Sequence, residues 1–306
     1  MKPKILVRTK GLSREEWLGR RRNGFGGSDV PTLLGINKYQ SIAQLVYDKR
    51  GEVQDREAGE AAYWGNTLED VVAKEFTKRT GKRLQKRNAI YQHPKYPWML
   101  ANLDRVVMGE DAGWEGKTTN MMYEDDGTCP EYYAVQVQHY MAVTGKSLWY
   151  VSVLAGGQRF YTYEVHRDDN FIDNTLIPLE KEMWELVQSG DTPPPDGTDA
   201  YKQLLGDLYP EAQASEVELP FESFDLLGQY DQLKQKEKEI KEKKQLIENT
   251  IKSQMENNER AFLLDRKVFW TNVTTNRFDA KSFEQDHPEL HKQYLKEQKS
   301  RRFQIK

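Results

Sequence analysis

Helical and strand-like spacings of apolar residues alternate along the first two hundred residues of the chain. Apolar positions that recur every three to four residues predict amphipathic helices. Residues 64–80 illustrate the pattern, because Leu68, Val71, Val72 and Phe76 fall on one predicted face. Helices of this kind are predicted over residues 12–22, 41–47, 64–80, 131–143 and 171–189.

Between these helices, continuous or alternating apolar runs predict strands. One uninterrupted run covers Trp98–Met108, and after a glycine-bounded turn a second strand is predicted at Trp114–Thr118. A further hairpin is predicted from Leu148–Leu154 and Arg159–Val165 about the pair Gly156-Gly157. The mixture of helices and strands predicts an α/β (α+β) fold.

The last third of the chain has a different character. A proline-rich linker at Asp191–Gly197 precedes it, and charged residues fill most positions of a long helix that follows. Apolar residues recur along this helix at spacings compatible with heptads: Leu226, Tyr230, Leu233, Ile240, Ile247 and Ile251. Glu237 and Lys244 interrupt the register, so both a coiled coil and a helix packed on the body of the protein stay open. We expect two domains, residues 1–205 and a C-terminal helical extension over residues 206–306.

The overall charge says little about partners, but the charge is unevenly distributed. The chain carries 45 Lys and Arg residues against 48 Asp and Glu residues, a formal net charge of −3. Residues 1–22 hold eight basic side chains and only Glu15 and Glu16 as acidic ones, which leaves this segment at +6. Such a segment can neutralise phosphates, or it can be the solvated face of a helix that Ser13 and Glu16 open as a capping box.

Cysteine usage and hydropathy exclude several classes of protein. The single cysteine, Cys129, excludes a disulfide framework and any zinc or iron–sulfur site built from cysteines. No apolar stretch approaches the roughly 20 residues of a membrane-spanning helix, and the first residues lack the apolar core of a signal peptide. We therefore expect a cytoplasmic protein without a membrane partner.

Three ionisable residues lie in the predicted strands. Asp104 lies in the apolar run, and Glu115 and Lys117 lie in the strand that follows the turn. Because residues i and i+2 of a strand point to the same face, Glu115 and Lys117 project together, and a hairpin can place Asp104 beside them. Carboxylates that hold one or two divalent cations, with a nearby ammonium that orients water, are the groups that phosphodiester hydrolysis needs. Oxygen ligands favour Mg²⁺ or Mn²⁺ over softer metals.

The spacing Asp-x10-Glu-x-Lys is not specific by itself. Asp231, Glu242 and Lys244 repeat it inside the charged helix, where they are solvated side chains. The first set differs because it lies in apolar strands, where an ionisable residue is costly without a partner or a function. A surface ion pair between Glu115 and Lys117 is the alternative interpretation.

Two predicted helices add polar side chains at inward positions. Glu69 lies at the edge of the apolar face of its helix, although an ordinary amphipathic helix gives the same pattern. Tyr133, Gln136 and Tyr140 share one helical face at i, i+3 and i+7. An amide between aromatic residues on an inward face is unusual, and core packing of the tyrosines alone is the other interpretation.

A glycine loop near the N-terminus is a candidate phosphate site. Arg21 and Ser28 bracket the segment Gly24–Gly27, and predicted helical residues follow it. A guanidinium and a hydroxyl beside free backbone N–H groups at a helix start can hold a phosphate. A simple turn that ends in a capping residue explains the pattern equally well.

Taken in order, these blocks resemble one protein family. The blocks are Trp17…Arg21…Gly27-Ser28, Gly65-Asn-Thr-Leu-Glu69, Leu103-Asp104, Glu115-Gly-Lys117 and Gln136-Val-Gln-His-Tyr140. Their order resembles the YqaJ-like viral recombinase family, which includes lambda exonuclease and falls among the PD-(D/E)xK nucleases. The resemblance spans roughly residues 12–190 and implies a mixed central sheet flanked by helices.

The resemblance also implies a role for each matching residue. Asp104, Glu115 and the backbone carbonyl of Gly116 would hold the metal, and Lys117 would position the attacking water. The family often carries a bulkier residue in place of Gly116, so glycine would leave this strand looser. The ions would be Mg²⁺ or Mn²⁺, two in each site. The remaining implied residues are Glu69 at the second metal or its water, Tyr133 and Gln136 steadying the site, and Arg21 with Ser28 at the 5′ phosphate.

The activity implied by the resemblance is digestion of linear double-stranded DNA from its 5′ ends. This leaves 3′ single strands for a single-strand annealing protein. The resemblance also implies that the protein is a homotrimer, encoded by a phage or prophage and located in the cytoplasm of a bacterial host cell. Two rival functions keep the same core or the same fold. One is an endonuclease directed by structure or sequence, and the other is a module that binds DNA ends without cutting.

Overall fold

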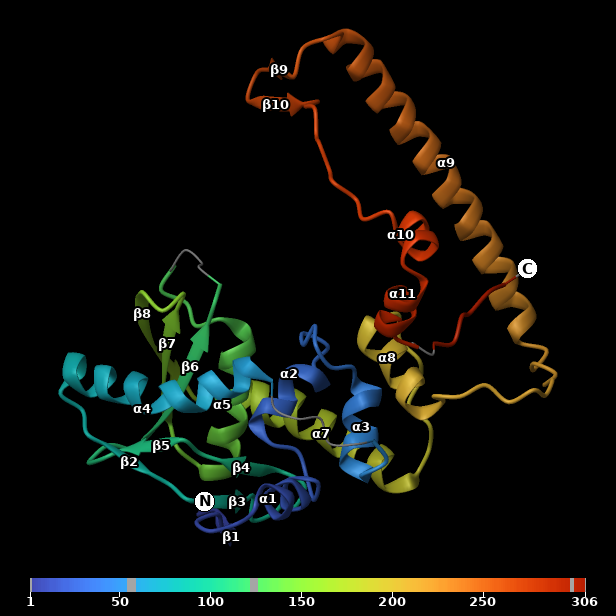
Figure 1. Ribbon diagram of the computed structural model, residues 1–306. Coiled ribbons are helices and arrows are strands. Elements are labelled where there is room, and N and C mark those ends of the chain that lie inside the picture. The colour runs from blue at the N-terminus through green and yellow to red at the C-terminus, as the bar shows by residue number, and fades with distance from the viewer. Residues whose placement is uncertain (1, 54–58, 122–125, 298–299, 306) are drawn as a thin grey trace. The chain divides into compact units, whose positions relative to one another are not determined.

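The computed structural model describes residues 2–53, 59–121, 126–297 and 300–305. The chain divides into two compact units, Met1–Pro210 and Glu211–Lys306 (Figure 1). The boundary expected between residues 205 and 206 falls inside helix α8 (Asp199–Leu208), five residues before the first unit ends. How functions divide between the two units stays a prediction.

A mixed five-stranded sheet forms the centre of the first unit, in the order β2-β5-β6-β7-β8. β6 and β7 are parallel, and every other neighbouring pair is antiparallel. The strands are β2 (Leu84–Lys86), β5 (Arg105–Val107), β6 (Ala112–Thr119), β7 (Leu148–Ala155) and β8 (Arg159–His166). The predicted hairpin about Gly156-Gly157 is therefore confirmed as β7 and β8.

A second, three-stranded sheet has the order β1-β3-β4. Its strands are β1 (Lys4–Arg8), β3 (Ala89–Gln92) and β4 (Leu100–Asn102). The prediction of one strand over Trp98–Met108 is wrong. β4 and β5 belong to different sheets, and Leu103 and Asp104 between them are not in a strand. If the pairing of β5 with β6 continued, Leu103 would lie opposite Gly116. Instead, the backbone N–H of Gly116 donates to the side-chain carboxylate of Asp104 (3.2 Å).

Helices cover both faces of the five-stranded sheet, as the resemblance implied (Figure 1). On one face, α4 (Glu60–Thr80) packs Phe76 against Trp114 and Tyr150. On the other face, α5 (Glu131–Thr144) contributes to a cluster that contains Val151. Tyr150 and Val151 are neighbours on β7 and pack into opposite clusters, as the alternation of a strand requires. The fold class expected from the sequence, α/β with a mixed central sheet between helices, is confirmed.

The boundaries of the other helices follow their local sequence signals. Ser13 caps the first helix: its hydroxyl accepts the N–H of Glu16, whose carboxylate accepts the N–H of Ser13, so the predicted capping box is present. One prediction about a helix face is wrong, because Val71 of α4 is 51% exposed and the buried face runs through Val72, Ala73 and Phe76. The remaining helices of this unit are α1 (Arg14–Arg21), α2 (Val30–Leu33), α3 (Ile42–Arg50), α6 (Asp169–Phe171), α7 (Ile177–Ser189) and α8.

The second unit contains one long helix and several short elements. α9 (Ser223–Met255) is 33 residues long, and most of its predicted apolar positions, Leu233 and Ile240 among them, are exposed to solvent, whereas Ile251 is half-buried. The other elements are β9 (Arg260–Leu263), β10 (Arg266–Phe269), α10 (Ala280–Asp286) and α11 (Pro288–Tyr294). Among the described residues, no helix of either unit has the length and hydropathy of a membrane span.

A buried histidine closes the turn between β3 and β4. Nδ1 of His93 accepts the backbone N–H groups of Lys95 (3.1 Å) and Tyr96 (3.0 Å). Burial, reinforced by nearby positive groups, lowers the pKa of His93 from 6.5 to about 4. Protonation would also place a hydrogen on the nitrogen that accepts both bonds.

We expect this histidine to make the fold sensitive to mild acid. The unfolded chain binds a proton at His93 near pH 6.5, whereas the folded chain does so only near pH 4, so stability falls as the pH drops between these values. The His93→Asn variant, whose Oδ1 can accept the same two N–H groups, should lack this component. Urea unfolding of both proteins across this range tests the prediction. A difference in unfolding free energy that does not change with pH would contradict it.

Candidate active site

The pairing of β5 with β6 brings Asp104, Glu115 and Lys117 together. Arg105 lies opposite Trp114, so Asp104 comes beside Glu115 and Gly116. Nζ of Lys117 lies 2.8 Å from Oε1 of Glu115. The acidic pair and the lysine predicted from the strand pattern therefore form one cluster on the face of the sheet that α5 covers.

Glu115 is held almost completely inside the protein. It is 4% exposed, and its Oε1 also accepts a hydrogen bond from Nε2 of Gln136 (2.7 Å). The same Nε2 donates to the hydroxyl of Tyr140 (2.8 Å), and Nζ of Lys117 lies 5.7 Å from the centre of the Tyr133 ring. The helical face predicted to carry Tyr133, Gln136 and Tyr140 is thus directed at the cluster.

The charges and pKa shifts of the cluster indicate that an additional positive charge would stabilise it. Burial, with the negative charge of Glu115 adding to it, raises the pKa of Asp104 to about 8. Burial is the largest single influence on Lys117 and acts to lower its pKa, but the charge and hydrogen bond of Glu115, together with the charge of Asp104, raise that pKa above its usual value. Oε2 of Glu115 is buried and has no hydrogen-bond partner among the described residues.

These observations fit a divalent ion bound by Asp104 and Glu115. An unpartnered carboxylate oxygen and a second carboxyl group whose ionised form is disfavoured would both be stabilised by a positive charge between them. The donors are oxygen atoms, which Mg²⁺ and Mn²⁺ prefer. The residues present therefore suit the metal that the family resemblance implies.

Gly116 is required by packing on the opposite face of β6. A Cβ atom at this position would lie 2.5 Å from Cη2 of Trp114, a distance that side chains do not tolerate. Trp114 is fully buried and donates its Nε1 hydrogen to Ser152 (3.0 Å). Glycine therefore leaves no empty space at this position, because the indole ring occupies the volume that a bulkier residue would take, and the looser strand stays a prediction.

Glu69 does not join the acidic pair in this structure. Its carboxylate lies 3.0 Å from Nη2 of Arg105 and 3.7 Å from Nζ of Lys86. Burial and the charge of Asp104 raise the pKa of Glu69, so the two carboxyl groups are within electrostatic reach. Among the described residues, no three or more His, Cys, Asp and Glu side chains are grouped so as to hold a metal ion.

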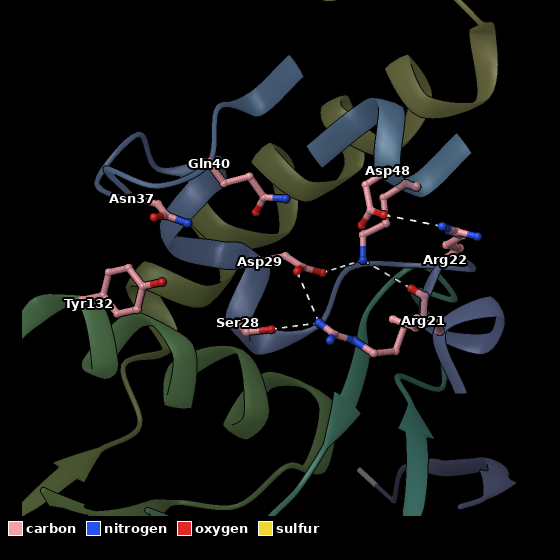
Figure 2. A pocket seen from close by; sticks show the side chains of 10 residues that line it. Arg21, Arg22, Ser28, Asp29, Asn37, Gln40, Asp48 and Tyr132 are labelled. Carbon is pink, nitrogen blue, oxygen red and sulfur yellow. Dashed lines mark hydrogen bonds and ion pairs between the residues drawn. The ribbon is translucent and has the colours of Figure 1, made fainter. Parts of the chain in front are cut away.

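Arg21 and Ser28 meet in a separate pocket of about 310 Å³, which Figure 2 shows from close by. Nη2 of Arg21 donates to Oγ of Ser28 (2.9 Å) and lies 3.5 Å from Oδ1 of Asp29. The sequence predicted these two residues together, but it did not predict most of the pocket. The lining residues that were missed are Leu18, Arg22, Asp29, Asn37, Gln40, Asp48, Lys49 and Tyr132.

The glycine loop joins this pocket to the acidic cluster. A Cβ atom on Gly27 would lie 2.6 Å from Cε1 of Tyr140 and 2.8 Å from the backbone oxygen of Gln136. Only glycine at position 27 therefore allows the loop to lie against the turn of α5 that contains Gln136, the residue that donates a hydrogen bond to Glu115. Because Ser28 follows Gly27 directly, the position of the pocket relative to the cluster is set by this contact.

Comparison with known proteins places these residues in a family. Residues 16–147 match the YqaJ-like viral recombinase domain. The uncharacterized protein YqaJ of Bacillus subtilis (strain 168) is 38% identical over 310 residues, which cover 99% of this chain and 97% of that protein.

Solved structures give a more distant likeness. The alkaline exonuclease of Laribacter hongkongensis is 20% identical with a TM-score of 0.44, over 57% of this chain and 97% of that chain. A phage-related exonuclease from Haemophilus somnus 129PT is 13% identical with a TM-score of 0.44, over 55% and 96%. These scores are too low to transfer residues, so the assignment rests on the sequence relative. Because 38% identity extends over nearly the whole of both chains, this protein belongs to the YqaJ-like viral recombinase family.

Proposed function

We propose that the protein is a metal-dependent nuclease that hydrolyses DNA phosphodiester bonds at the cluster of Asp104, Glu115 and Lys117. The observation that carries the proposal is the ion pair between Lys117 and the buried Glu115 (2.8 Å), beside the half-buried carboxyl group of Asp104. A buried charged cluster of this kind is costly to fold and is expected where it has a chemical task.

Each side chain has a distinct part in this proposal. Asp104, Glu115 and the backbone carbonyl of Gly116 hold Mg²⁺ or Mn²⁺, which when bound stabilises negative charge on the phosphate and lowers the pKa of water. Lys117 donates a hydrogen bond that orients the attacking water toward phosphorus. Gln136 and Tyr133 hold Glu115 and Lys117 in place. Glu69 would serve a second ion after leaving Arg105.

We further propose that cutting starts at 5′ ends of linear double-stranded DNA and proceeds from 5′ to 3′. The pocket of Arg21 and Ser28 supports this, because a guanidinium binds a terminal phosphate through charge-assisted hydrogen bonds. The 3′ single strands that remain would be the substrate of a single-strand annealing protein. We also propose a ring of three subunits, which light scattering of the full chain would measure, with residues 206–306 peripheral to it.

Purified protein, Mg²⁺ and two forms of one duplex test the proposal. We expect digestion of linear DNA, with acid-soluble nucleotides released from the 5′-labelled strand, and no cutting of closed circular DNA. Nicking or cutting of circles would favour an endonuclease of the same core. Binding of ends without any cleavage would favour the non-cutting module, and both results would refute the exonuclease.

A further inference from the structure

The pocket of Arg21 contains a buried ion pair that the proposed reaction does not use. Nζ of Lys49 lies 2.6 Å from Oδ2 of Asp29, and the side chain of Lys49 is 2% exposed. The same carboxylate oxygen accepts the backbone N–H of Gly26 (2.8 Å). Lys49 comes from α3, so the pair forms only when two distant segments pack together.

Arg21 contacts this pair through both its backbone carbonyl and its guanidinium group. Nζ of Lys49 donates to the backbone oxygen of Arg21 (3.3 Å), while the Arg21 guanidinium lies near Oδ1 of Asp29. On its other side the guanidinium lies over the ring of Trp17, 4.8 Å from the ring centre. Figure 2 shows the guanidinium directed between Ser28 and Asp29. Arg21 is thus held in one orientation before any ligand arrives.

The distances indicate how charge is shared among the three groups. Asp29 lies 2.6 Å from Lys49 and 3.5 Å from Arg21, so Lys49 is its closer partner. Without Lys49, the buried carboxylate would have Arg21 as its nearest cation and would compete with an incoming phosphate. Lys49 itself is too enclosed to offer a ligand much surface.

We propose that Lys49 is a positioning residue for recognition of a 5′-terminal phosphate: by neutralising Asp29, it leaves the charge and hydrogen bonds of Arg21 available to that phosphate. The proposal rests on the proposed function only in its choice of ligand. It predicts that the lysine matters when Asp29 is present and not when Asp29 is absent.

The test uses binding without cleavage. Full-length protein in EDTA is titrated with one short duplex carrying either a 5′ phosphate or a 5′ hydroxyl, and the ratio of the two dissociation constants is measured. We expect wild type to favour the phosphate, and Lys49→Met to reduce that preference about tenfold, the loss typical of a charged hydrogen bond. The double variant Asp29→Asn/Lys49→Met removes both buried charges and should recover most of the preference.

A matched control separates this role from general stability. His139 and Glu180 form another fully buried pair (2.6 Å) that does not line the pocket. Glu180→Gln should lower the melting temperature and leave the phosphate preference unchanged.

Three results would overturn the proposal: no preference in wild type, an unchanged preference in Lys49→Met, or a double variant as impaired as the single one. If Lys49→Met does not fold, the double variant decides alone, since a lost preference there refutes the role. If the protein does not cut DNA in the presence of Mg²⁺, the proposed nuclease activity is refuted, but the measured phosphate preference still tests the role of Lys49.

Discussion

Replacing Glu115, Asp104 or Lys117 by alanine is expected to abolish DNA cleavage while the protein stays folded. In the proposed mechanism, each substitution removes either a carboxylate that holds the metal or the ammonium that orients the water. The loss in rate should therefore exceed the ~10²–10⁴-fold that is typical of a positioned proton-transfer group. Single-turnover digestion of linear duplex, with thermal unfolding of each variant, measures both quantities.

Metal binding should divide these variants into two groups. Asp104→Asn and Glu115→Gln should lose most of their affinity for Mn²⁺ in calorimetry, whereas Lys117→Met should keep it, because the lysine is not one of the proposed ligands. Asp111→Ala is a suitable control, since this carboxylate belongs to the same hairpin but is 67% exposed and pairs with Lys146. A folded Glu115→Ala protein that cuts at a near-normal rate would refute the assignment of the site.

The core of the site is predictable because it depends on short-range geometry. Strand periodicity alone places Glu115 and Lys117 on one face, and a single hairpin brings Asp104 to them. Helical periodicity does the same for Gln136 and Tyr133. The break after Leu103 was not predictable, because the apolar run continues across it and the two halves differ only in which sheet they join.

The residues that sequence reasoning missed depend on contacts between distant segments. Lys49 looks like an ordinary solvated lysine of an amphipathic helix, and only packing against the glycine loop buries it beside Asp29. Arg105 follows a predicted metal ligand, yet its pairing with Glu69 joins a strand to a helix 36 residues away. An ion pair of this kind leaves no periodic signal in the sequence, because either partner alone has the composition of a surface position.

The exposed apolar positions of α9 illustrate a different limit. Their heptad spacing predicts burial against something, and the single chain leaves Leu233 and Ile240 exposed. The pattern identifies the face of the helix that would be buried, but it does not identify the surface that would cover this face.

The second large effect is expected at Gln136, which touches the site only through Glu115. Its Nε2 donates to Glu115 and to Tyr140, so Gln136→Leu leaves Oε1 of Glu115 with Lys117 as its remaining partner. Residues that orient a metal ligand typically contribute about 10–100-fold to metal affinity or activity, and we expect a loss of that size in kcat.

The neighbouring glutamine on the same helix provides the comparison that decides the cause. Gln138 is also buried, but it donates to the backbone oxygen of His166 (2.7 Å) and accepts the N–H of Asp168 (3.0 Å), away from the cluster. Gln138→Leu removes as many hydrogen bonds from the same helix, so it should lower the melting temperature at least as much as Gln136→Leu. Its kcat and its apparent Mg²⁺ affinity should stay within about twofold of wild type, the margin expected of a residue without contact to the ligands. If both variants lose activity equally, Gln136 acts through stability alone. If only Gln136→Leu does, and excess Mg²⁺ restores part of its rate, the amide holds Glu115 in the orientation that the metal requires.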